Sequence, residues 1–115
     1  MSKNKSQKVL ALPSVKAIDV RAEIEKLARE RSINVILLDH AVDRQEQRGV
    51  TSRQILNVLK NGEQIGTVTW CTKEENGWRC KISRVTAGAK VTVVAKLVER
   101  EERTCLVVTV WTDGE

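Results

Sequence analysis

With 115 residues, 41% hydrophobic and 30% charged, the sequence fits one globular domain that can bury a core without disulfides or metals. The net charge of +5 falls to +2 without the three lysines of the opening MSKNKSQK, which excludes a strongly basic domain. Phe and Tyr are absent, so aromatic platforms for stacking single-stranded bases are scarce. No apolar run reaches the roughly 18 residues of a membrane span, and no signal-like core is present. We expect a cytoplasmic protein without membrane contact.

The three cysteines are odd in number and form no C-x-x-C pair. In a cytoplasmic protein we expect Cys71, Cys80 and Cys105 to be reduced and to act as small buried hydrophobic residues. The alternatives are a zinc site built with His40, which is the weaker interpretation, or a disulfide between Cys71 and Cys80 across the first hairpin. We therefore predict no metal site.

The N-terminal third divides into a tail and a helix. Residues 1–12 are polar and basic and predict a disordered tail, and residues 13–32 predict a helix that starts near Pro13. Apolar residues recur within it at helical spacing, at Ala17, Val20, Ile24, Leu27 and Ala28. This helix, placed at about 14–31, either docks on the core or packs on a partner as an arm or an oligomerisation element.

The main domain is expected over residues 33–115, beginning with a short strand at 33–38. Asp39 then predicts the cap of a polar helix that ends before Gly49. Thr51 and Gln54 match the capping-box pattern of a third helix, with Val50 and Ile55 as its hydrophobic staple. Asn61-Gly62 predicts its C-terminal end.

After residue 63 the hydrophobic pattern alternates with a period of two. We expect strands at about 65–72, 78–85, 90–98 and 104–112, linked by turns at Asn76-Gly77, Ala87-Gly88 and 99–103. Consecutive strands with short links form an antiparallel meander. The fold class is therefore predicted as α+β, with N-terminal helices packed on one face of a four-stranded antiparallel meander.

The second and third of these strands predict one apolar and one basic face. A two-residue turn at Ala87-Gly88 sets Arg79 opposite Lys96 and Lys81 opposite Val94. We predict Arg79, Lys81 and Lys96 as residues that hold an RNA backbone, with a simple solvated surface as the alternative.

A second candidate site lies on the polar helix. His40, Arg44 and Arg48 are spaced i, i+4, i+8 and share one helical stripe. A histidine exchanges protons near neutral pH, and guanidinium groups bind phosphate by paired hydrogen bonds. Metal-free RNA cleavage needs both kinds of group. A polar stripe is more often a solvated face, and a single histidine is more often structural.

The stretch DHAVDRQEQRGVTSRQILNVLKNGEQI resembles the opening of the domain of unknown function 4258 family. The matching positions are His40-Ala41, Arg44, Arg48-Gly49-Val50 and Gly62-Glu63. The later half is similar too, at Trp78-Arg79-Cys80, Gly88, Val91–Val94 and the closing VVTVW at Val107–Trp111. The resemblance covers about residues 38–112.

This resemblance implies a RelE-like fold, within the wider barnase, EndoU and colicin group. Many proteins of that group are metal-independent endoribonucleases, and several are toxins paired with antitoxins. The resemblance thus implies a RelE-like toxin domain that cleaves RNA without a cofactor, with RNA or the ribosome as target and a cognate antitoxin as partner. The catalytic residues that match the pattern are His40, Arg44, Arg48 and Thr109. The alternative is a non-catalytic module of the same fold that binds protein or nucleic acid, in which His40 bridges to Thr109.

Overall fold

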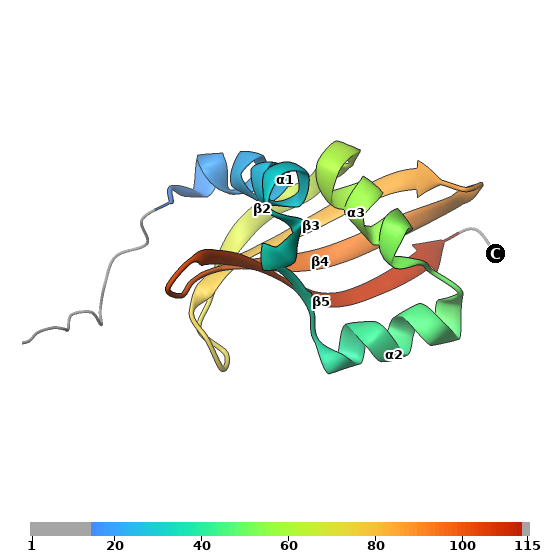
Figure 1. Ribbon diagram of the computed structural model, residues 1–115. Helices are drawn as coiled ribbons and strands as arrows, with labels where there is room; N and C mark the ends of the chain where they lie inside the picture. Colours follow the sequence, from blue (N-terminus) through green and yellow to red (C-terminus); the bar gives the residue numbers. More distant parts are fainter. Residues whose placement is uncertain (1–14, 114–115) are drawn as a thin grey trace, which may run out of the picture.

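Helices precede a strand meander in the computed structural model, which describes residues 15–113 (Figure 1). The predicted tail at 1–12 and Pro13 lie outside the described residues. The helical part contains η1 (Ala17–Asp19), α1 (Val20–Glu30), η2 (Ser32–Asn34), α2 (Asp39–Arg48) and α3 (Ser52–Asn61). The strands are β1 (Val35–Leu37), β2 (Glu63–Cys71), β3 (Gly77–Thr86), β4 (Ala89–Glu99) and β5 (Arg103–Asp113). None of the helices in this part of the chain is long and apolar enough to cross a membrane.

The sheet has five strands in the order β1-β5-β4-β3-β2. Strands β2 to β5 form the predicted antiparallel meander. The prediction of a purely antiparallel four-stranded sheet was wrong, because β1 pairs in parallel with β5, Val35 beside Cys105 and Leu37 beside Val107. An unpaired edge exposes backbone N–H and C=O groups, and β1 satisfies those of β5. The fold is α+β with three α-helices and a mixed sheet.

The helices lie at two places on this sheet. Helices α1 and α3 cover one face, whereas α2 follows β1 and runs along β5 at the edge of the sheet (Figure 1). The prediction that the helices share one face therefore holds for α1 and α3 alone. Beyond β1, the edge of β5 is covered by a helix instead of a strand.

Helix α1 docks on the core, which was one of its two predicted placements. Its apolar stripe is buried at Val20, Ile24, Leu27 and Ala28. Val15, Ala41 of α2 and Val50 belong to the core too. Its other residues come from α3 and the helix-facing side of the sheet, namely Ile55, Val58, Leu59, Cys80, Ile82, Val91, Val93, Ala95, Leu97, Cys105, Val107 and Val110. An ion pair of 2.7 Å between Arg103 and Glu23 ties α1 to β5 as well.

The polar helix α2 and helix α3 meet at a sharp turn. Gly49 ends α2 with a left-handed backbone, φ +67°, as expected for a glycine after a helix. Asp39 is the first helical residue and makes no side-chain cap, so its predicted capping role was wrong. The capping box of α3 is confirmed: Gln54 N–H donates to Thr51 Oγ1 at 3.0 Å, and Thr51 N–H donates to Gln54 Oε1 at 2.9 Å.

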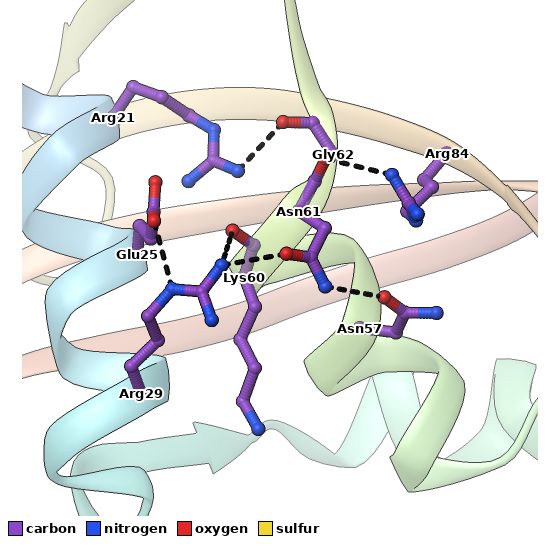
Figure 2. Close-up of polar contacts among 8 residues, drawn as sticks. All are labelled: Arg21, Glu25, Arg29, Asn57, Lys60, Asn61, Gly62 and Arg84. Atoms are coloured by element: carbon purple, nitrogen blue, oxygen red, sulfur yellow. Dashed lines mark hydrogen bonds and ion pairs between the residues drawn. The ribbon is translucent and has the colours of Figure 1, made fainter.

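Three arginines satisfy the last carbonyl groups of α3 (Figure 2). Arg21 donates to Gly62 O at 2.8 Å, Arg29 to Lys60 O at 3.1 Å, and Arg84 to Asn61 O at 3.1 Å. The carbonyls of Lys60 and Asn61 lack helical partners and carry the negative end of the helix dipole, which favours cations, and Gly62 O belongs to the residue directly after the helix. The contacts join α1, α3 and β3 at one point.

Gly62 itself does not adopt the left-handed conformation that its place after α3 predicts. Its backbone is extended, with φ −78° and ψ 172°, and leads directly into β2. Glycine is required there because an added Cβ would lie 2.6 Å from Val58 O and 2.8 Å from Ser83 O.

The hairpin turns follow two different patterns. Thr86 pairs with Ala89, which confirms the two-residue turn at Ala87-Gly88, and both turn residues have positive φ. The first turn does not follow the prediction, because Gly77 belongs to β3 and pairs with Cys71. The turn is therefore longer and spans residues 72–76.

Replacing Thr51 by Ala should lower the free energy of unfolding by about 1 kcal/mol, because one N-terminal N–H of α3 loses its acceptor. Urea unfolding followed by circular dichroism measures this change. Thr72→Ala, an exposed position in the first turn, is the control and should leave the midpoint unchanged. Equal midpoints for Thr51→Ala and the parent would show that the cap contributes nothing.

Candidate nucleic-acid interface

The face of the sheet turned away from α1 and α3 carries the predicted basic residues. The predicted register is confirmed: Arg79 pairs with Lys96, and Lys81 pairs with Val94. On β5 the same two rows continue to Leu106 and Thr109. Because side chains in one row of a sheet share a face, the structure brings Arg79, Lys81, Lys96 and Thr109 together on this open face.

The three cations differ in their exposure. Arg79 and Lys81 are exposed, whereas Lys96 is only 6% exposed. Lys96 lies on the central strand β4, where the side chains of the neighbouring strands cover it. Its Nζ donates a hydrogen bond of 2.8 Å to Lys73 O in the turn at 72–76. The open face thus carries two exposed cations and one enclosed cation.

Trp111 belongs to this face and was not predicted as a site residue. The ammonium group of Lys81 lies 5.6 Å from the centre of the Trp111 ring, which is a cation–π contact. The alternation of side chains along a strand could have predicted its place on this face. Trp111 is two residues from Thr109 and therefore points to the same side of β5. An aromatic ring beside cations suits the contact of a base or a sugar.

Two depressions adjoin each other on the open face and share Arg79. The first, here named the Cys71 pocket, has a volume of about 410 Å³ and is lined by Cys71, Lys73, Arg79, Lys96 and Leu106 among others. The second, here named the bulge pocket, has about 400 Å³ and includes Lys81.

The bulge pocket lies beside an irregularity of the edge strand. The pairing of β2 with β3 shifts between Ile65 and Thr69, and Gly66 within the shift has φ +70°. Bulges often bend a strand next to a functional site. Here the bulged segment forms one wall of the pocket that contains Lys81.

The cysteines divide into two buried and one accessible residue, and all three are free. The prediction of buried hydrophobic thiols is confirmed for Cys80 and Cys105 and wrong for Cys71, which is partly exposed. Burial raises the pKa of Cys80 to about 11 and that of Cys105 to about 12. A hydrogen bond from the Lys73 backbone, then the charges of Lys96 and Arg79, lower the pKa of Cys71.

The predicted catalytic residues of α2 lie at the border of this face. His40 and Arg48 are exposed and Arg44 is half-buried, on a helix that runs along the strand of Thr109. Within residues 15–113 none of these three side chains makes a hydrogen bond or an ion pair, so the structural bridge from His40 to Thr109 is not formed. The residues lining the two pockets include Leu38, just before α2, and none of these three.

The described residues hold no group of three or more His, Cys, Asp and Glu side chains arranged to bind a metal ion. Apart from Glu74 and Glu75 in the Cys71 pocket, the interface is thus built from cations, one aromatic ring, hydroxyl groups and a thiol. These groups bind anions and hydrogen-bond acceptors.

The fold and the open face define a small α+β domain with a cationic sheet surface. The family model described as Domain of unknown function (DUF4258) matches residues 37–112, about two thirds of the chain. The chain therefore belongs to the DUF4258 family, as its sequence pattern indicated. The match runs from the end of β1 to β5 and leaves out α1. No curated protein and no solved structure matches the chain.

In the folded protein at about pH 7.5, iodoacetamide should modify Cys71 alone, because the thiolate is the reactive form and only Cys71 combines exposure with a lowered pKa. After unfolding without a reductant, all three thiols should react. Mass spectrometry counts the added groups. Modification of Cys80 or Cys105 in the folded state, or a need for reductant, would contradict the assignment.

Proposed function

We propose that the protein is a RelE-like toxin domain of the cytoplasm, an endoribonuclease that binds RNA across the open face and cleaves it without a metal. One observation supports the proposal most. The two rows Arg79–Lys96–Leu106 and Lys81–Val94–Thr109 contain three cations and no acid. Phosphate groups are the common anions that repeat along a chain, so a row of cations suits a nucleic-acid backbone.

The proposed chemistry assigns a role to each predicted catalytic residue. The ribose 2′-hydroxyl attacks the adjacent phosphorus, and the bond to the 5′-oxygen breaks. His40 transfers the proton, and its exposed ring has both nitrogens available within the described structure. Arg44 and Arg48 stabilise the charge on the phosphate, and the Thr109 hydroxyl donates a hydrogen bond to it. RNA that crosses the open face towards β5 reaches α2.

The proposed partners follow from the same assignment. The target is RNA, free or on the ribosome, and a cognate antitoxin protein controls the activity. The second candidate is a non-catalytic module that binds nucleic acid or protein with this face. It is favoured by one observation, namely that His40, Arg44 and Arg48 do not line the two pockets beside the cations.

Arg79→Gln with Lys81→Gln should weaken binding of single-stranded RNA and flatten its salt dependence, by about 0.7 in slope for each phosphate that the protein no longer neutralises. Both side chains are exposed, so the fold should persist. The control is Lys26→Gln with Arg53→Gln, which removes the same charge from the helices on the other face. Fluorescence anisotropy over a salt series measures both quantities. Equal slopes for the two double variants would show that the open face is a solvated surface that does not bind the RNA backbone.

His40→Ala should slow RNA cleavage by at least about 100-fold in the presence of EDTA, because a positioned proton donor or acceptor is lost. Gln47→Ala, an exposed position on the same helix, is the control and should cleave normally. Gel analysis of labelled RNA, with and without ribosomes, measures the rate. Unchanged cleavage by His40→Ala, or its unfolding, would remove His40 from the catalytic site and favour the binding module.

A further inference from the structure

The Cys71 pocket contains a buried positive charge, that of Lys96. Lys96 is 6% exposed, and one of its three N–H donors is used by Lys73 O. Among residues 15–113 no carboxylate forms an ion pair with it. A buried ammonium group is strongly disfavoured unless an anion or several acceptors surround it.

The acids near the pocket do not fill this role. Glu75 is held by Arg100 through two hydrogen bonds of 2.7 and 2.9 Å, and the charge of Lys96 is only the last of the causes that lower the pKa of Glu75. Glu74 also lines the pocket, but it is exposed in the turn at 72–76. The pocket thus keeps one enclosed cation, Lys96, which lies near Glu75 but forms no ion pair with either acid.

Arg79 adds a second cation at the mouth of the pocket. It pairs with Lys96 across β3 and β4, is exposed, and lines both pockets of the open face. Together, Lys96 offers an ammonium group that also hydrogen-bonds Lys73 O and the Cys71 sulfur, and Arg79 offers an exposed planar guanidinium group. The lowered pKa of Cys71 agrees with this arrangement, because, after the backbone hydrogen bond of Lys73, the same two charges stabilise its anionic form.

One part of the pocket wall is apolar. It is formed by Leu38, Leu106 and Val108. An anion without a carbon skeleton would leave this wall in contact with water, whereas a sugar or base covers it. The volume of about 410 Å³ is within the range of small-molecule sites and suits a ligand of one nucleotide unit.

We propose that the Cys71 pocket binds one phosphate group of a nucleotide, with Lys96 and Arg79 as its ligands and the sugar or base against the apolar wall. The nucleotide class of the ligand rests on the proposed RNA function. The bound phosphate is either an internal phosphodiester of RNA or the terminal phosphate of a free nucleotide or RNA end. Both sources present the same anionic oxygens to the two cations.

Protection of Cys71 from iodoacetamide tests this site in the full chain, because this thiol lines the pocket. Adenosine monophosphate should slow the alkylation saturably, by about tenfold at ten times its Kd, since only the empty pocket reacts. Sodium chloride at equal ionic strength is the control for screening and should protect little. A rate that is independent of the nucleotide would overturn the proposal.

Two variants test whether Arg79 and Lys96 bind the nucleotide that protects Cys71. Arg79→Gln should raise the nucleotide concentration for half-protection by about tenfold, and Lys96→Gln should abolish protection. Each variant is compared with its own rate without nucleotide, because removing a cation also changes the thiol. Lys90→Gln, an exposed cation at the far end of β4, should behave as the parent. If Lys96→Gln unfolds, Arg79→Gln alone decides, and unchanged half-protection in Arg79→Gln overturns the site.

RNA oligonucleotides with and without a 5′-phosphate separate the two sources. Equal protection by both indicates an internal phosphodiester, and protection by the phosphorylated form alone indicates a terminal phosphate. The outcome also separates this proposal from the general one. If anisotropy shows that RNA binds but Cys71 is not protected, the phosphate site in the pocket is overturned and RNA binding itself stands. If the mononucleotide protects Cys71 but RNA does not bind, the phosphate site in the pocket stands and the proposed RNA function is overturned.

Discussion

Strand β4 is buried on both sides over eight consecutive residues, Val91 to Val98, and the rest of the fold is arranged around this constraint. On one side its apolar residues pack under α1 and α3. On the other side its neighbours are β3 and β5 and, at Lys96, the turn at 72–76. A strand enclosed in this way also buries polar side chains, here Thr92 and the charged Lys96. The enclosed charge of the open face is thus a consequence of the packing of β4.

The basic residues of the chain serve two different purposes, which the net charge does not reveal. Arg21, Arg29 and Arg84 are engaged with the last carbonyls of α3 and hold the helices on the sheet. On the open face, Lys81 contacts the Trp111 ring and stays exposed, as does Arg79. Arg84 and Lys81 lie three residues apart in the same strand, yet strand alternation sends them to opposite faces. The site therefore depends on fewer cations than the sequence contains.

Helix α1 lies outside the segment that matches the DUF4258 family, yet it supplies four buried residues to the core. Its ion pair to β5 and the contact of Arg21 with Gly62 attach it to two places within the family segment. An element that provides this much burial acts as part of the domain. This packing leaves the open face as the surface on which the proposed activities depend, since the opposite face is covered.

The sequence by itself determined the features that depend on local chemistry: the capping box at Thr51, the turn at Ala87-Gly88, and the alternation that puts Arg79 and Lys96 in one row. The sequence did not predict the features that depend on a partner far away in the chain. The three residues of β1 carry no signal for pairing with β5 some 70 positions later, and Gly62 is extended because β3 approaches it closely. The pattern marked Lys96 as a surface cation and Cys71 as a buried thiol. The tertiary structure reversed both, because the curvature and neighbours of a strand decide which of its side chains reach water.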